Sequence, residues 1–295
     1  MTDTSPTPAG HSLPLLLLVA CALLLALLAE FLLPSEAEAA VGTPTPPSLT
    51  ARQQSLLKLL GSDVIGKPVA LEPIMHVQNW CPMGDEHGLF EHADGVGGDQ
   101  AVSCRWVKRR PGEPLDSESG AWTLSSTHRD IKYITHDSGE LLLPTETDLN
   151  QGVITVFDPP EPLLLAGVPE GTPKKTAMRV SVYDMHDPST LKYSGHLTST
   201  YLDLGGYTLQ VPHGSYEARL ISVSNVGKVG PADIDTEYLA FYAKGVGRVA
   251  YINRKHVSAY LFYNTTTQHG MVLSSSQPGA NSPESDPVSS HSPRP

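Results

Sequence analysis

Three histidines and two cysteines are concentrated in one short segment of the chain. His76, Cys81, His87, His92 and Cys104 fall within 29 residues, among several aspartates and glutamates. Imidazole and thiolate groups are ligands that zinc and copper prefer in proteins. The segment could therefore serve a metal-binding module or a metal-dependent enzyme, with His76, His87 and His92 as the metal ligands.

The spacing of these residues matches no known metal motif, and a disulfide is the favoured interpretation. Cys81 and Cys104 stand alone rather than in Cys-x-x-Cys pairs, and His87 and His92 miss the i, i+4 spacing of a zincin helix. Two thiols left in an exported domain form a disulfide in an oxidising compartment. We therefore predict a Cys81–Cys104 disulfide and no cofactor, with free thiols and a metal site as the alternatives.

Other groups that could do chemistry lack the pattern that catalysis needs. The glycine-rich stretch 95–99 has no lysine of a phosphate-binding loop. The sequence also contains no Gly-x-Ser-x-Gly elbow that would expose a nucleophilic serine. We therefore assign no catalytic residue.

A long apolar run near the amino end predicts that the chain leaves the cytoplasm. Residues 13–33 are almost wholly apolar, and about 20 such residues match the hydrocarbon core of a bilayer. Three fates are open: a signal peptide cut after Ala39, an uncut membrane anchor, or lipid attachment at Cys21. The anchor lacks a preceding Lys or Arg, and the apolar residues after Cys21 disfavour a lipoprotein. Each fate places residues 40 onward in the cell envelope, facing away from the cytoplasm.

The composition divides the chain into four regions. Residues 1–39 form the signal peptide or anchor, and the proline-rich residues 40–48 form a linker. Residues 49–273 form an exported β-rich domain. Residues 274–295 contain one large aliphatic side chain and are predicted to be disordered, because they cannot bury enough apolar surface.

The elements of the central domain are predominantly strands. A helix is predicted first, from Thr50 as the N-cap to Gly61 as the residue after its end. The fold class is mainly β, a curved antiparallel sheet or half-barrel meander with one short N-terminal helix. Turns are expected at 187–189, 205–206, 212–214, 227–231 and 245–247. They separate predicted strands at 178–183, 196–204, 207–211, 216–223, 237–243, 248–253 and 257–263.

The charge pattern excludes one class of partner. The net charge is −11, and no basic block exceeds Lys108-Arg109-Arg110. Proteins that bind nucleic acid carry a basic patch or stripe. We therefore expect no nucleic-acid partner.

Turn and strand-end motifs in the second half of the domain resemble those of a known family. They are Val211-Pro212-His213-Gly214-Ser215-Tyr216 and Tyr242-Ala243-Lys244-Gly245-Val246-Gly247. The chain is similar here to a bacterial exported β-domain family of unknown function, over residues 178–272. The resemblance implies a fold similar to that of the LolA and LolB lipoprotein carriers, and it implies no activity.

Together these patterns favour a non-enzymatic cell-envelope protein that binds an apolar ligand or another envelope protein. We expect a concave apolar pocket lined by Leu220, Phe241 and Tyr260, and contact with the membrane through the N-terminal segment. The metal-dependent alternative on residues 76–104 stays open.

Overall fold

The computed structural model describes most of the β-rich region. It covers residues 47–82, 87–93, 102–108, 122–126, 130–137, 139–259 and 263–277. For positions 87, 92, 102–108, 122–126, 130–137 and 277 it describes the backbone alone. The predicted leader, with Cys21, and the tail beyond residue 277 lie outside the described residues, as does Tyr260. Within the described ranges, none of the helices has the length and apolar character needed to cross a membrane.

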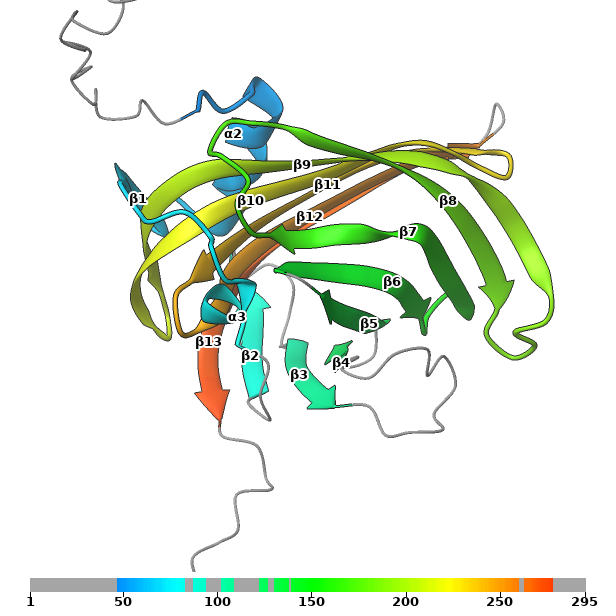
Figure 1. Cartoon of the computed structure of the whole chain (residues 1–295), viewed down its shortest axis with the longest axis horizontal. Helices are drawn as coiled ribbons and strands as arrows, with labels where there is room; N and C mark the ends of the chain where they lie inside the picture. Colours follow the sequence, from blue (N-terminus) through cyan, green and yellow to red (C-terminus); the bar gives the residue numbers. More distant parts are fainter. Residues whose placement is uncertain are drawn as a thin grey trace, which may run out of the picture. The chain divides into compact units, whose positions relative to one another are not determined.

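The described residues form one thirteen-stranded antiparallel sheet, which confirms the predicted fold class (Figure 1). The first seven strands are β1 (Ile65–Val69), β2 (His87–His92), β3 (Val102–Lys108), β4 (Trp122–Ser126), β5 (Asp130–Asp137), β6 (Glu140–Asp148) and β7 (Val153–Leu165). The remaining six are β8 (Lys174–Asp184), β9 (Leu191–Val211), β10 (Gly214–Val229), β11 (Ala232–Ala243), β12 (Gly247–Ala259) and β13 (Tyr263–Gln277).

The long strand β9 has different neighbours along its two halves. Neighbouring strands follow the order β1-β9-β10-β11-β12-β13-β2-β3-β4-β5-β6-β7-β8, and β9 also pairs with β8. The first half of β9 pairs with β8 and its second half pairs with β1, while β10 lies along its other edge. The strands β8 to β12 arch strongly, so the sheet has a convex and a concave face (Figure 1).

Most predicted turns in the second half of the domain are confirmed. The residues between β8 and β9, between β9 and β10, and between β11 and β12 include most of the turn residues expected there; Gly214 and Gly247 already begin β10 and β12. The strand predicted from 216 continues to Val229, so the chain turns at Gly230 and Pro231. The strands predicted at 248–253 and 257–263 are one strand, β12, as far as Ala259.

The turn predicted at Gly205-Gly206 is wrong, because β9 runs through both glycines as one strand. Gly205 has a φ of 90°, and the pairing with β10 shifts register at this point, between Arg219 and Ile221. At Gly206 a Cβ would lie 2.5 Å from the carbonyl oxygen of Val69 in β1. The two glycines thus allow an irregularity and a close strand approach within a continuous strand.

The predicted N-terminal helix is confirmed with its cap. The Thr50 hydroxyl accepts a hydrogen bond from the Gln53 backbone N–H (3.2 Å), and the Gln53 side chain accepts one from the Thr50 N–H (3.0 Å). This reciprocal pair is a capping box. Helix α2 (Ala51–Leu57) continues into the 3₁₀ turn η1 (Lys58–Leu60), and Gly61 follows with a φ of 95°.

Helix α2 and η1 lie across the convex face of the sheet, which we call the outer face (Figure 1). The Gln53 side chain donates a hydrogen bond to the Ser222 hydroxyl of β10 (3.4 Å). At Gly270 of β13, a Cβ would lie 2.5 Å from the carbonyl oxygen of Leu59, so η1 approaches the bare backbone of the strand. The buried apolar residues of this segment are Leu56, Leu57 and Leu60.

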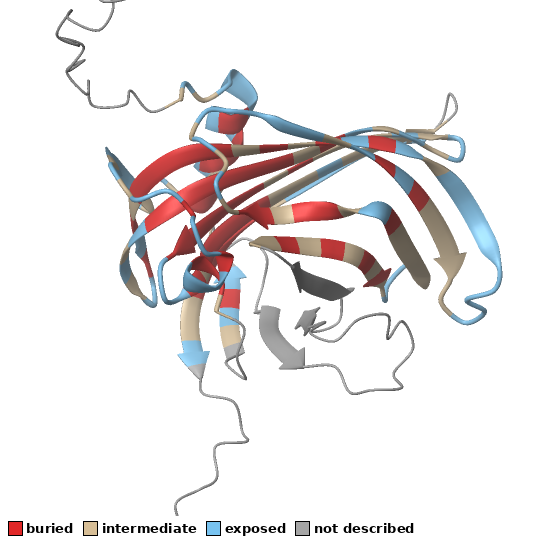
Figure 2. Ribbon diagram, viewed as in Figure 1, coloured by how far each residue is buried: buried red, intermediate tan, exposed pale blue. Residues whose placement is uncertain are grey.

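The opposite, concave face, which we call the inner face, is covered along only part of its length. Near the end of β7, the Leu165 N–H donates to the Tyr201 hydroxyl of β9 (3.4 Å). Within β9, alternate residues from Leu197 to Asp203 are buried, whereas residues 191–194 are exposed. Figure 2 shows the same gradient, with burial concentrated away from the β8–β9 turn. A second short helix, α3 (Val77–Trp80), follows β1 in the chain.

Candidate functional site

The structure describes the side chains of His76 and Cys81 from the histidine and cysteine segment. His76 is exposed and precedes α3, and Cys81 follows α3. The side chains of His87, His92 and Cys104 are outside the described part of the structure. Among the side chains that are described, no group of three or more His, Cys, Asp or Glu could hold a metal ion.

Cys81 carries a free, buried thiol, so the structure does not show the predicted disulfide to Cys104. Its side chain is 4 % exposed and belongs to the hydrophobic core. Burial raises the pKa of the Cys81 thiol to about 12, although the charge of Arg248 acts in the opposite direction. Because the thiolate is the reactive and metal-binding form, Cys81 behaves as a core residue.

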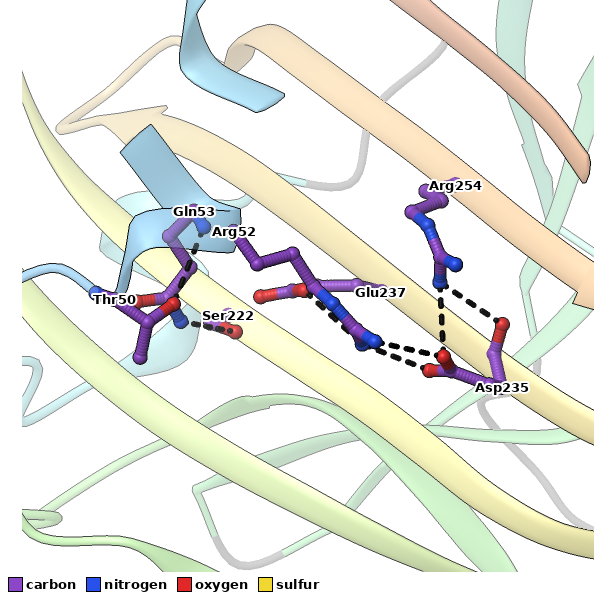
Figure 3. Close-up of polar contacts among 7 residues, drawn as sticks. All are labelled: Thr50, Arg52, Gln53, Ser222, Asp235, Glu237 and Arg254. Carbon is purple, nitrogen blue, oxygen red and sulfur yellow. Dashed lines mark hydrogen bonds and ion pairs between the residues drawn. The ribbon is translucent and has the colours of Figure 1, made fainter. Parts of the chain in front are cut away.

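Acidic and basic side chains fasten α2 to the outer face (Figure 3). Arg52 donates to both carboxylate oxygens of Asp235 in β11, each at 2.9 Å. Arg254 of β12 donates to the same carboxylate at 3.1 Å. Glu237 lies 3.9 Å from Arg52 and is 4 % exposed. We call these four residues the outer ionic cluster.

The two acids of the outer ionic cluster have opposite pKa shifts. Burial opposes the ionisation of Asp235, but the hydrogen bonds and charges of Arg52 and Arg254 outweigh it and hold its pKa below the ordinary value. Burial raises the pKa of Glu237, although Gln53 and Arg52 act in the opposite direction. Every member of the cluster contacts another member, so its role is to hold the helix on the sheet.

Replacing Arg52 by alanine is expected to lower the free energy of unfolding at pH 7 by about 1 kcal/mol, because Asp235 loses a guanidinium that donates two hydrogen bonds to it. The loss is modest because the Arg52 side chain is itself about half exposed. The lowered pKa of Asp235 means that its contribution is present above the ordinary pKa of an aspartate, about 3.9, and is lost as the pH falls through the folded value. The difference between the two proteins should therefore shrink in urea denaturation at pH 3.

Lys174→Ala is the matched control for this prediction. Lys174 has the same 48 % side-chain exposure as Arg52 and makes one surface contact, to Glu140 at 3.0 Å. It should cost less than about 0.5 kcal/mol. Equal losses for the two variants would show that the outer ionic cluster does not fasten α2.

A second ionic cluster lies on the inner side of the sheet, around the 2 % exposed Arg219 of β10. Its Nε and Nη2 donate to the two carboxylate oxygens of Asp203 at 2.8 and 2.9 Å. Nη2 also donates to Glu170 (2.8 Å), and Nη1 donates to the carbonyl oxygens of Leu71 and Glu72 (3.0 Å each). All five N–H groups of the guanidinium therefore have an acceptor.

The Arg219 cluster connects parts of the chain that are far apart in sequence. It joins β9 and β10 to the segment after β1 and to the segment after β7. Burial alone would lower the pKa of Arg219, but the hydrogen bonds and charges of Asp203 and Glu170 raise it. A group that is saturated in this way holds the structure together and is not available to a ligand.

A chain of hydrogen bonds at the end of β13 has the order nucleophile, base and orienting group. His213 Nε2 lies 3.1 Å from Ser276 Oγ, and His213 Nδ1 contacts the Tyr216 hydroxyl. His213 and Ser276 are exposed to solvent. The three side chains form a hydrogen-bond chain on the protein surface.

Two of the three residues predicted to line an apolar pocket, Leu220 and Phe241, lie on the outer face. Leu220 and Phe241 are direct partners across β10 and β11, and both are 0 % exposed. They share their face with Ser222, which contacts α2, because side chains two residues apart point to the same side of a strand. They are core residues of the face that the helix covers, and Tyr260 falls outside the described residues.

The part of the inner face near the β8–β9 and β10–β11 turns carries apolar side chains that are not fully buried. The register brings Val182, Tyr193, Val229, Ile234 and Val257 to this part of the face, from β8 to β12. Tyr193 is 51 % exposed, and the other four are half-buried. We call these five residues the inner apolar patch.

Two glycines lie on the inner face within this patch. A Cβ at Gly195 would lie 1.9 Å from the carbonyl oxygen of Lys228, and one at Gly227 would lie 2.2 Å from that of His196. The neighbouring strands thus approach too closely for any side chain at these positions. Peptide backbone forms the floor between the apolar side chains.

No protein-family model and no curated protein matches the sequence. Two solved structures resemble the fold. One is a candidate exported protein with a YmcC-like fold from Bacteroides fragilis, 10 % identical, with a TM-score of 0.37, covering 70 % of this chain and 100 % of that chain. The other is a candidate lipoprotein from Parabacteroides distasonis, 9 % identical, with a TM-score of 0.33, covering 67 % of this chain and 98 % of that chain.

Proposed function

We propose that this chain is an exported, non-enzymatic protein of the cell envelope and that its inner apolar patch binds an apolar ligand. The observation that carries the proposal is the incomplete burial of Val182, Tyr193, Val229, Ile234 and Val257 on one concave surface. Contiguous exposed apolar surface in a soluble domain marks an interaction site or a ligand site. The concave face favours a ligand that the sheet can partly surround.

The predicted leader supports the location outside the cytoplasm. Its apolar run, residues 13–33, has the length and position that an export machinery reads. The proline-rich residues that follow it would separate the β-rich domain from a membrane surface. A protein in this location meets lipids and other apolar molecules.

Binding of an alkyl fluorophore to the purified protein tests the proposal. Ile234→Gln should weaken the affinity about tenfold, because it removes a branched apolar side chain from the centre of the patch and puts an amide there. Fluorescence titration of the wild type and the variant measures the two dissociation constants.

Val226→Gln is the matched control. Val226 lies on the adjacent strand β10, is 56 % exposed, and points to the outer face. Its variant should bind the fluorophore as the wild type does. The proposal fails if the wild type does not bind the fluorophore, or if the two variants weaken binding equally.

A further inference from the structure

Large apolar side chains are exposed along one end of the sheet, in or beside the turns that join neighbouring strands. They are Leu149 in the β6–β7 turn (38 % exposed), Leu191 and Tyr193 at the start of β9 (49 % and 51 %), and Tyr263 at the start of β13 (55 %). We call these four residues the apolar rim. Exposed apolar side chains that lie close together mark a surface that binds another molecule or a membrane.

The first part of the apolar rim is formed by two turns that touch. The Met185 N–H of the β8–β9 turn donates a hydrogen bond to the Gly152 carbonyl oxygen of the β6–β7 turn (2.9 Å). Strand β9 begins at Leu191, but its pairing with β10 begins only at Gly195. The β8–β9 hairpin therefore projects beyond the end of β10 and presents Leu191 to solvent (Figure 1).

The second part of the apolar rim continues from Tyr193 to β13. A Cβ at Gly230 of the β10–β11 turn would lie 2.7 Å from Tyr193 Cδ1, so the Tyr193 ring lies against this turn. Ala232, the first residue of β11, pairs with Ala259 of β12, which in turn pairs with Tyr263. The rim thus follows one edge of the sheet beside the inner apolar patch, to which Tyr193 also belongs.

The charges near the first part of the apolar rim are mostly negative. Residues 148–153 and 184–193 contain the carboxylates of Asp148, Asp184 and Asp187 and one lysine, Lys192. The lysine balances one of these carboxylates, since its Nζ lies 2.7 Å from Asp184. At pH 7, where histidine is mostly neutral, this part of the rim is therefore negative and would be repelled by an anionic surface.

The composition of the apolar rim favours a lipid bilayer as its partner. Leucine side chains on projecting turns can enter the apolar boundary of a bilayer, and amphipathic tyrosine rings are enriched at that boundary. Residues 34–46 reach at most about 45 Å when fully extended. An apolar run 13–33 held in a bilayer would therefore keep the start of the described region within that distance of the membrane.

We propose that the apolar rim docks on a zwitterionic lipid bilayer and thereby brings the inner apolar patch next to the lipid. This inference rests on the proposed function, because it names the surface from which the patch receives its apolar ligand. The exposed leucine and tyrosine side chains supply the binding energy, which grows with the apolar area that enters the boundary. The negative charge near Asp187 makes docking on an anionic bilayer weaker.

Photo-crosslinking of the full chain on phosphatidylcholine vesicles tests the docking, with a diazirine on the acyl chain of a trace lipid. Mass spectrometry should find at least threefold more label at Tyr193 than at Val246, which is exposed in the β11–β12 turn at the other end of these strands. The double variant Leu191→Gln with Tyr263→Gln should lower the label at Tyr193 about tenfold, because two apolar side chains no longer enter the boundary. Label on residues 13–33 is the internal reference for attachment to the vesicle.

Two variants with single replacements are the controls. Val226→Gln removes an equally exposed apolar side chain from the outer face, and it should keep the label at Tyr193. Ile234→Gln changes the inner apolar patch alone and should also keep this label. The double variant leaves the inner apolar patch intact, so it should bind the soluble alkyl fluorophore as the wild type does.

Four outcomes would overturn the docking. They are a label at Tyr193 no stronger than at Val246, a label that survives in the double variant, a stronger label on phosphatidylglycerol vesicles, and a label that Ile234→Gln abolishes. The last would mean that the label comes from lipid bound in the patch. A wild type that keeps the label but does not bind the alkyl fluorophore would overturn the proposed function instead.

Discussion

Replacing Arg219 by leucine is expected to lower the free energy of unfolding by about 3 to 5 kcal/mol, the cost of leaving a buried charge without its partner. Asp203 is 2 % exposed and takes two of the five hydrogen bonds of the guanidinium. In the variant the Asp203 carboxylate would still accept a hydrogen bond from the Gly205 N–H (2.9 Å), but it would lose the positive charge that compensates its own. Urea denaturation followed by circular dichroism measures the loss.

The double variant Arg219→Leu with Asp203→Leu separates the two sources of this loss. It removes both buried charges, so it should recover a large part of the stability that Arg219→Leu alone loses. If the single variant loses less than about 1 kcal/mol, Asp203 does not depend on Arg219 and the Arg219 cluster does not hold β9 and β10 to the neighbouring segments.

Replacing Phe241 by alanine is expected to cost about 3 to 5 kcal/mol, because the phenyl ring is wholly buried and leaves a cavity. Phe241 faces Leu220 across the strands, and its ring meets the Tyr207 ring edge to face at a centroid distance of 6.1 Å. These contacts are lost together. Thermal and urea denaturation of the purified variant measure the loss.

Val246→Ala is the matched control for Phe241→Ala. Val246 lies in the β11–β12 turn and is 38 % exposed, so its truncation should cost less than about 1 kcal/mol. A Phe241→Ala protein with nearly unchanged stability that no longer binds the alkyl fluorophore would contradict the account. That result would place the ligand at Phe241 and Leu220, under α2, instead of on the inner face.

Local signals in the sequence predicted the elements of the fold well. Thr50 and Gly61 delimit the N-terminal helix because each has a backbone role that few other residues fill. The turn signals around Pro188, Pro212 and Gly245 were equally informative. At Gly205 and Gly206 the same signal was misleading, since a positive φ and a close strand approach occur within a strand as well as at its end.

The side of the sheet on which a residue lies could not be predicted from the sequence. Alternation identifies Leu220 and Phe241 as apolar positions, but it does not say whether a helix covers them. The inner apolar patch depends on the register of each strand against the next, from β8 to β12. A signal for the Arg219 cluster was present and was missed. Arg219 and Asp203 are opposite charges embedded in two neighbouring apolar strands.

Photo-crosslinking with a long-chain alkyl diazirine tests binding on the inner apolar patch, because it maps the contact of an apolar chain residue by residue. We expect labels on β8, β9 and β11 at Val182, Tyr193 and Ile234, with labelling suppressed by an excess of the alkyl fluorophore. Labels concentrated on α2 or at the outer-face residue Val226, or labels that the fluorophore does not suppress, would contradict binding on the inner apolar patch.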